Sequence, residues 1–151
     1  TLVTIRKPYV KIESVMTRHV EFAAASDPVS ELAVMMGDLD VGAVPVGSAE
    51  DLLGIVTDRD ILYRVVARGL HPTAVEAREV LSTPVISCGP DDSLQTAMDL
   101  MAANHVRRLA VKGEGGKVVG WVTLADLSRK LLLDSQTVQA GLAEISRDTV
   151  D

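Results

Sequence analysis

The chain has 151 residues, 47% of them apolar and only 3% aromatic, so its core must consist mainly of aliphatic side chains. A formal net charge of −6 argues against the basic surface that nucleic acids require, and no nucleic acid is expected as the main partner. The single cysteine, Cys88, excludes an internal disulfide. No Cys or His cluster has the spacing of a zinc site, so no metal is expected.

The distribution of apolar residues also argues against a membrane protein. No apolar run reaches the roughly 18 residues that a membrane-spanning helix needs. No charged segment followed by an apolar one, the pattern of a signal peptide, opens the chain. We therefore expect no membrane partner and a cytoplasmic location.

The elements predicted for the first half begin with an extended segment over residues 20–23. A helix follows, with Asp27 as its expected N-cap and Pro28 as its first helical residue. Its apolar residues recur at helical spacing: Leu32, Met35, Met36 and Leu39. Two strands, dense in Val and Ile, and a closing helix complete this half, over residues 42–46, 52–57 and 58–68.

The second half repeats this order. Residues 85–87 are extended, and Asp92 is the expected N-cap of a helix, with Gln95 three residues further on. Two strands and a closing helix follow, over residues 107–112, 117–123 and 124–133. A terminal helix is predicted over residues 135–147, where apolar residues again recur on one face.

The two halves are copies of one unit. Residues 15–17 (VMT) match 80–82 (VLS) at an offset of 65, and 54–60 (GIVTDRD) match 120–126 (GWVTLAD) at an offset of 66. The extra residue falls near the glycine-rich turn at 113–116, where an insertion is tolerated. Self-similarity of this kind indicates an internal duplication.

The duplication defines the predicted domains: repeat 1 over residues 15–68, a linker over 69–79, repeat 2 over 80–133, and a C-terminal helix or tail over 134–151. One half alone would bury too little surface, and its strands lack an alternating polar face. The predicted fold is therefore α+β (α/β-like), with two β-α-β-β-α repeats packed sheet to sheet about a pseudo-twofold axis. Such packing leaves two related clefts at the seam, where a ligand would sit.

The segments 54–60 and 120–126 resemble the signature of the cystathionine-β-synthase (CBS) domain family, a glycine and two hydrophobic residues before Thr-x-x-Asp. Residues 44–46 (VPV), residues 83–85 (TPV) and the duplication itself support a tandem CBS pair, often called a Bateman module. The resemblance covers roughly residues 15–133. It implies a regulatory module that binds an adenosine-containing ligand, such as AMP, ADP, ATP, S-adenosylmethionine or NAD(H).

The Thr-x-x-Asp residues have two interpretations. By resemblance, Asp60 and Asp126 hold ribose hydroxyls, and a carboxylate can indeed accept two hydroxyl protons. Thr57 and Thr123 would lie near a phosphate, which the free N–H groups of a helix N-terminus favour. The alternative is a capping box alone. In it, the Thr hydroxyl accepts from the backbone N–H of the Asp, and the Asp carboxylate accepts from the backbone N–H of the Thr. Such a cap contributes about 1 kcal/mol without any ligand.

Four further residues are candidates for the same site. By resemblance, Pro45 with its strand and Val85 in the first strand of the second half would pack against adenine. Arg107 and Arg108 enter a strand that lines the cleft, and a guanidinium recognises phosphate bidentately. The equivalent positions 42 and 43 carry no cation, so the two clefts should differ. The alternative is that both arginines are solvated and form surface ion pairs with neighbouring acidic residues.

Nothing in the chain resembles a catalytic set. There is no Ser-His-Asp arrangement, metal triad or isolated carboxylate pair, and the glycines at 113–116 lack the spacing of a phosphate loop. We predict that the chain is not an enzyme and requires no cofactor. We expect a sensor in which ligand binding changes the arrangement of the two halves, and an unknown effector protein responds to that change. Homodimerisation through helical faces is expected by resemblance. The alternative is a ligand-free structural or dimerisation module.

Overall fold

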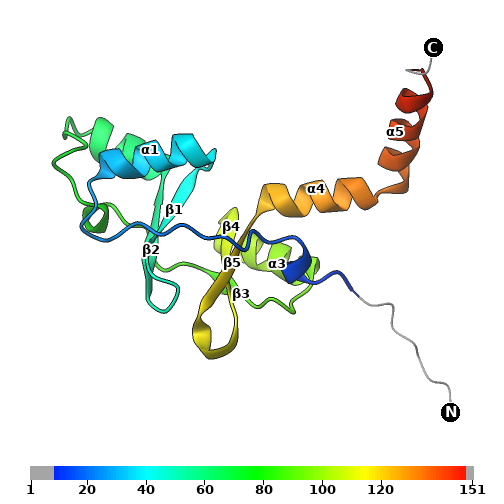
Figure 1. The fold of residues 1–151 in the computed structure, drawn as a ribbon, viewed down its shortest axis with the longest axis horizontal. Helices are drawn as coiled ribbons and strands as arrows, with labels where there is room; N and C mark the ends of the chain where they lie inside the picture. The colour runs from blue at the N-terminus through cyan, green and yellow to red at the C-terminus, as the bar shows by residue number, and fades with distance from the viewer. Residues whose placement is uncertain (1–8, 149–151) are drawn as a thin grey trace.

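The computed structural model describes residues 9–148, in which two similar halves lie side by side and a helical arm projects from one of them (Figure 1). The first half contains α1 (Val29–Leu39), β1 (Ala43–Gly47), β2 (Leu52–Thr57), α2 (Asp58–Ile61) and the π-helical turn η2 (Leu62–Val66). The second contains β3 (Ser87–Cys88), α3 (Leu94–Asn104), β4 (Arg108–Lys112), β5 (Val118–Thr123) and α4 (Leu124–Asp134). The remaining elements are three 3₁₀ turns and a last helix, η1 (Ile12–Ser14), η3 (Ala77–Glu79), η4 (Glu114–Gly116) and α5 (Gln136–Asp148).

Each half contains a small sheet. The strands β1 and β2 pair antiparallel, as do β4 and β5, and β3 joins β4 in parallel. The first-half counterpart of β3, predicted over residues 20–23, contributes only one parallel bridge, from Ala23 to Val46. The first sheet is therefore two-stranded, because Ala23 alone exchanges backbone hydrogen bonds with β1.

The N-caps of α1 and α3 differ from the predicted residues. Pro28, not Asp27, occupies the N-cap of α1, and Asp27 Oδ2 accepts at 2.8 Å from the N–H three residues before it. Ser93, not Asp92, caps α3 with its Oγ. Asp92 also accepts from the N–H three residues before it, at 2.7 Å. Both carboxylates therefore close the turn that leads into the helix instead of capping the helix itself.

Two aliphatic clusters form the core, one in each half, and each includes residues from a segment that leads into the other repeat. We call residues 12–17 and 77–82 the lead-in segments. Ala77 and Val80 are buried in the cluster of the first half, whereas Ile12 is buried in that of the second. Part of the predicted linker thus belongs to the first core, and the exchange of lead-in segments ties the two halves together.

The lead-in segments also define the pseudo-twofold axis. Thr17 forms an antiparallel bridge with Trp121 of β5, and Ser82 forms the equivalent bridge with Ile55 of β2. A glycine precedes each bridge partner on its strand, and a Cβ at Gly120 would lie 2.9 Å from the backbone oxygen of Thr17. The signature glycine is required because the lead-in segment passes so close to the strand. The two sheets pack together about this axis, as predicted.

The projecting arm consists of α4 and α5. Figure 1 shows α5 beyond the end of α4, away from both sheets. Its bounds, Gln136–Asp148, match the terminal helix that the apolar pattern predicts. Among residues 9–148, no helix combines the length and the apolar character needed to cross a membrane.

Candidate functional site

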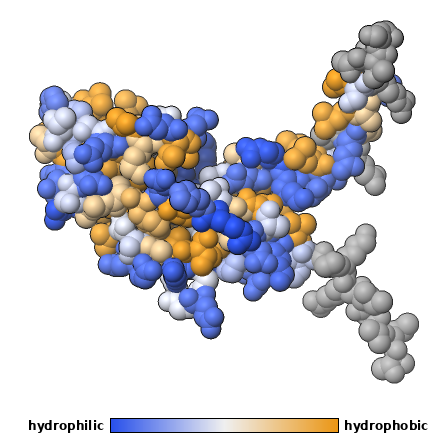
Figure 2. Space-filling view, in the orientation of Figure 1, coloured by the Kyte–Doolittle hydropathy of each residue, from blue (hydrophilic) through white to orange (hydrophobic). Residues whose placement is uncertain are grey.

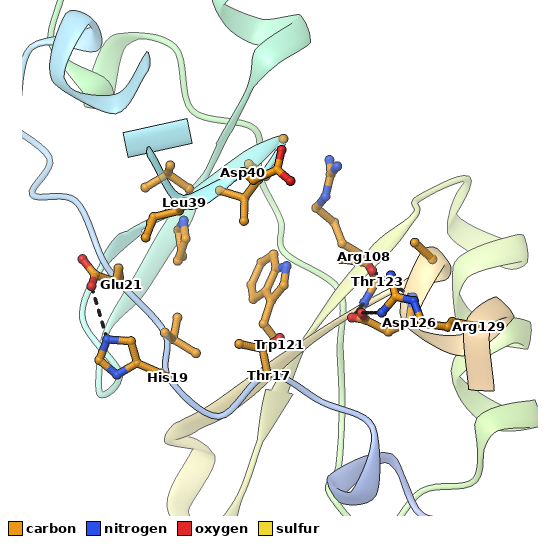
Figure 3. Close-up of a pocket in the computed structure, with 17 residues that line it drawn as sticks. Thr17, His19, Glu21, Leu39, Asp40, Arg108, Trp121, Thr123, Asp126 and Arg129 are labelled. Carbon is orange, nitrogen blue, oxygen red and sulfur yellow. Dashed lines mark hydrogen bonds and ion pairs between the residues drawn. The ribbon is translucent and has the colours of Figure 1, made fainter. Parts of the chain in front are cut away.

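A cavity of about 480 Å³ lies at the seam between the two halves (Figure 3). Its walls come from Thr17 at the end of the first lead-in segment and residues 19–21 after it, from the end of α1 through the start of β1, from β4 and β5, and from the first turns of α4. The charged or titratable side chains that line it are His19, Glu21, Asp40, Arg108, Asp126 and Arg129. A concave site with a few convergent polar groups and aliphatic walls is the usual form of a small-molecule site.

The second signature motif provides one end of this cavity. Thr123 Oγ1 accepts from the N–H of Asp126 at 3.2 Å, and Asp126 Oδ2 accepts from the N–H of Thr123 at 2.9 Å. This capping box starts α4 at Leu124. The second carboxylate oxygen, Oδ1, lies 3.6 Å from Nη1 of Arg129. The Asp126 side chain remains 22% exposed, so its carboxylate is accessible from the cavity.

The first signature motif forms the same capping box in a different environment. Asp60 Oδ2 accepts from the N–H of Thr57 at 2.9 Å, and Thr57 Oγ1 accepts from the N–H of Asp60 at 3.0 Å. In addition, Ser82 Oγ lies 3.0 Å from both carboxylate oxygens, and Arg64 Nε lies 3.7 Å from Oδ1. Asp60 is buried, with 8% of its surface exposed. Neither Thr57 nor Asp60 lines the cavity.

Two differences between the repeats explain this asymmetry. Arg64 donates from Nη1 to the backbone oxygens of Val80 and Leu81, which holds the second lead-in segment against Asp60. Lys130, at the position equivalent to Arg64, instead pairs with Asp134 at 3.4 Å. The first lead-in segment therefore lacks this anchor. Within the described chain, no hydrogen bond joins Asp126 to Thr17, the counterpart of Ser82.

A second, smaller cavity of about 360 Å³ lies on the pseudo-symmetric side. Its walls are aliphatic or neutral: Ile55, Ser82, Thr83, Pro84, Ile86, Asn104 and Val106. No charged side chain lines it. The expectation that the two clefts differ is met in the geometry, because only the larger cavity has both a carboxylate and a guanidinium in its wall.

The two candidate arginines differ in burial and in position relative to the larger cavity. Arg108 is partly buried and lines the larger cavity, whereas Arg107 is exposed and outside its wall. Adjacent residues of a strand point to opposite faces, so only one of them can face the cavity. Arg108 Nη2 lies 3.4 Å from where a Cβ of Gly42 would be, and Asp58 Oδ2 lies at the same distance from that point. A side chain at position 42 would therefore contact both this cation and this anion.

The remaining candidates also differ in place. Pro45 lines the larger cavity, but Val85 lines neither cavity. Val20, which the repeat offset makes the counterpart of Val85, is the residue that faces the larger one. Sequence reasoning missed Trp121 and Arg129. The position of Trp121 inside the second signature, where the first repeat has isoleucine, was the available signal.

Two α-β-β-α repeats, the second with the additional strand β3, enclose a cavity at their seam, which is the architecture of a tandem regulatory module. The chain belongs to the CBS domain family, because the family model matches residues 12–67 and 77–133. Tandem CBS modules are generally regulatory and bind ligands. The prediction that the chain contains two CBS domains in tandem is therefore confirmed.

Two curated relatives match this chain over most of their length, and a third matches it over about three fifths of its length. The chain is 38% identical over 120 residues to the uncharacterized protein YlbB of Bacillus subtilis, covering 78% of this chain and 80% of YlbB. It is 32% identical over 139 residues to the CBS domain-containing protein YhcV of Bacillus subtilis, covering 92% and 97%. A match to the uncharacterized protein MK0525 of Methanopyrus kandleri is 33% identical over 119 residues. It spans 78% of this chain but only 61% of MK0525.

Solved structures share the fold. A CBS-domain protein from Burkholderia ambifaria superposes with a TM-score of 0.77 at 26% identity, covering 84% of this chain and 97% of that one. Hypoxic Response Protein I, solved with two coordinated zinc ions, superposes with a TM-score of 0.70 at 30% identity. The match covers 80% of this chain and 98% of that one. A hexameric CBS-CP12 protein from bloom-forming cyanobacteria gives 0.72 at 25%, covering 87% and 75%. In the described part of this chain, no three His, Cys, Asp or Glu side chains are grouped to hold a metal.

Proposed function

We propose that this chain is a regulatory sensor module that binds an adenosine-containing ligand in the larger cavity between its CBS repeats. In this proposal the carboxylate of Asp126 accepts the ribose hydroxyls, and the N-terminus of α4 at Thr123 lies toward the phosphate. The ligand would change the relative arrangement of the two halves, and an effector protein would respond to that population shift.

One observation carries the proposal. In the first repeat, the motif carboxylate of Asp60 already binds a hydroxyl group, that of Ser82, at 3.0 Å from each of its oxygens. Asp126 has the same place in the second repeat and the same capping box, but within residues 9–148 no side-chain hydroxyl is hydrogen-bonded to its carboxylate. The internal contact in one cleft therefore indicates what the exposed carboxylate in the other cleft would accept. A ribose supplies two adjacent hydroxyls of this kind.

The cavity wall carries three carboxylates, those of Glu21, Asp40 and Asp126, and two guanidiniums, and it is the guanidiniums that favour an anionic group next to the ribose. Arg108 is partly buried in the wall, and Arg129 lies within 3.6 Å of Asp126 on the first turns of α4. A guanidinium in a partly desolvated wall binds phosphate more strongly than an exposed one. Because the smaller cavity has no charged lining residue, we expect one ligand per chain. The candidates are AMP, ADP, ATP, S-adenosylmethionine and NAD(H).

Calorimetric titration with AMP, ATP, S-adenosylmethionine and NADH tests the proposal. We expect saturable heat with at least one of them, at a stoichiometry near one per chain, and loss of that heat in Asp126→Ala. The matched control is Asp60→Ala, which removes the equivalent carboxylate outside the larger cavity; the folded fraction of this variant should still bind the ligand at the same stoichiometry. An absence of heat with all four ligands at millimolar concentration would overturn the proposal.

Self-association belongs to the same proposal. Exposed aliphatic and aromatic side chains lie on the helices, among them Leu62, Tyr63 and Val66 beside α2 and Leu131, Leu132 and Leu133 on α4. Figure 2 shows apolar side chains along the surface of the arm formed by α4 and α5. A homodimer through helical faces would bury such residues, and the CBS-CP12 neighbour forms a hexamer. Light scattering during size-exclusion chromatography should give about twice the mass of 16.1 kDa, and a monomeric mass would contradict this part.

A second candidate function is a ligand-free dimerisation platform. The observation that favours it is that both capping boxes are complete without any ligand. In that case Asp126→Ala would cost about 1 kcal/mol of stability, as for any cap, and would change no ligand effect. Loss of ligand-induced thermal protection in Asp126→Ala would exclude this candidate.

A further inference from the structure

The wall of the larger cavity contains one large aromatic ring, that of Trp121. It is the only tryptophan of the chain, and no Phe or Tyr of the described residues lines this cavity, although the imidazole of His19 does. Figure 3 shows the indole projecting from β5 between Thr17 and the segment that carries Leu39 and Asp40. The ring thus lies toward the middle of the site, across from elements of the first repeat.

Backbone hydrogen bonds fix the main chain of the residue that carries this ring. Trp121 donates its N–H to the backbone oxygen of Thr17 at 2.9 Å and accepts from the N–H of Thr17 at 2.8 Å. On the other side it stands opposite Ala110 of β4 in the antiparallel register. A residue fixed from both edges loses little conformational freedom when a ligand packs against it, which preserves binding free energy.

The surroundings of the ring suit a flat apolar group. The uncharged residues that share the wall are small or aliphatic, among them Val20, Val41, Ala43 and Pro45. The pseudo-symmetric position in the smaller cavity carries Ile55 instead of tryptophan. The aromatic ring is therefore confined to the cleft that also has the carboxylate and the guanidinium.

The indole N–H has no protein acceptor within residues 9–148, and it is not among buried polar atoms that lack a partner. It is thus accessible and able to donate to a ligand atom. In Figure 3 the nitrogen-bearing edge of the ring faces the side of the site where Arg108 lies.

From these observations we infer that Trp121 is a specificity-determining residue that stacks on the planar base of the ligand. The inference rests on the proposed function and deepens it: the cavity selects ligands that combine an aromatic base with a ribose and an anionic group. Aromatic side chains stack on nucleobases of any sequence, because every base has a π-face. Sugar phosphates without a base would lack this contact and bind poorly.

The test compares wild type, Trp121→Phe and Trp121→Ile by calorimetry with the tightest binder of AMP, ATP, S-adenosylmethionine and NADH. The isoleucine variant reproduces the residue of the smaller cavity. It should bind roughly 5- to 150-fold more weakly, the range expected for loss of one base stack, whereas the phenylalanine variant should retain most of the affinity. Ribose 5-phosphate, which has no base, should bind weakly and equally to all three proteins.

A second measurement does not depend on the folding of any variant. Because Trp121 is the only tryptophan, saturation of wild type with the ligand should change the intensity of its fluorescence emission. Heat of binding without a fluorescence change, or equal affinities for wild type and Trp121→Ile, would overturn the inference and leave the proposed function intact. No binding to wild type by any of the four ligands would instead overturn both.

Discussion

The hydroxyl of Ser82 lies 3.0 Å from each carboxylate oxygen of Asp60, so the motif aspartate of the first repeat is bound by the lead-in segment of the second. Arg64 strengthens this contact by donating to two backbone oxygens of the same segment. Asp60 is therefore a structural residue that holds the two repeats together. Asp126, its counterpart, has no such contact with residues 12–17, and its side chain remains 22% exposed at the wall of the larger cavity.

This difference predicts opposite effects for the two aspartates. Asp60→Ala should lower the free energy of unfolding by about 2–3 kcal/mol, because it leaves the buried partners of the carboxylate unpaired. Asp126→Ala should lower it by only about 1 kcal/mol, the cost of a helix cap. Urea denaturation of both variants checks this order. Equal losses of stability would contradict the assignment of different roles.

Substitution of the two adjacent arginines should affect ligand affinity to different extents. Arg108→Ala should weaken the binding of an anionic ligand by roughly 10- to 150-fold, because it removes a charge-assisted hydrogen bond from a partly buried wall. Arg107→Ala, the matched control, should change affinity by no more than about twofold, because Arg107 is exposed outside the cavity. Calorimetry at two salt concentrations checks both. A larger effect at Arg107 would place the phosphate elsewhere.

The signature glycine of the second repeat should be intolerant of a side chain. A Cβ at Gly120 would lie 2.5 Å from Sδ of Met16 and 2.9 Å from the backbone oxygen of Thr17. We expect Gly120→Ala to lower stability by about 1–3 kcal/mol through overpacking. In contrast, Gly37→Ala in α1 meets no atom within 4 Å and should raise stability by about 0.5–1 kcal/mol. Thermal unfolding of both variants measures these changes in stability. Stabilisation of both variants would contradict the prediction.

The single cysteine should be unreactive at neutral pH. Burial, assisted by the nearby Asp92 carboxylate, raises the pKa of the Cys88 thiol to about 11, compared with 9.0 for a free thiol. The folded protein thus holds this proton more tightly than the unfolded chain does. The titration of this thiol leaves stability unchanged below about pH 9 and should lower it as the pH rises from about 9 toward 11. Rapid labelling by a disulfide reagent at pH 8, at the rate of the unfolded chain, would refute this.

A control separates the thiol from other alkaline effects. In Cys88→Ala the decline of stability between pH 9 and 11 should be smaller than in wild type, because the group with the raised pKa is absent. Denaturation curves at a series of pH values measure this slope for both proteins. An identical slope would show that another group is responsible.

Most of the fold could be predicted from repeated patterns along the chain. The offset between the two signatures predicts two equivalent units, and the dense Val and Ile segments predict the four long strands within a residue or so of their bounds. The caps were less predictable. Asp27 and Asp92 have the composition of N-caps, but each accepts from an earlier N–H, since the preceding turn competes for the same oxygen.

The candidate site was predictable in type and only partly in detail. Asp126 and Asp60 occupy equivalent places in equivalent motifs, so no local pattern distinguishes the exposed carboxylate from the buried one. The distinction depends on Arg64 and Ser82, which meet Asp60 only after the second lead-in segment folds onto the first repeat. The same holds for Arg107 and Arg108, because which strand face meets the seam depends on how the repeats pack.

Local patterns thus determined the α+β class, the duplication and the helix-capping motifs, because hydrophobic periodicity and side chain-to-backbone capping act over a few residues. Tertiary packing decided which cleft has charged side chains in its wall, which arginine enters it and that Trp121 faces its interior. These features arise from contacts between residues far apart in the chain, such as Thr17 with Trp121 and Ser82 with Asp60, and one residue type can serve either role until such a contact forms.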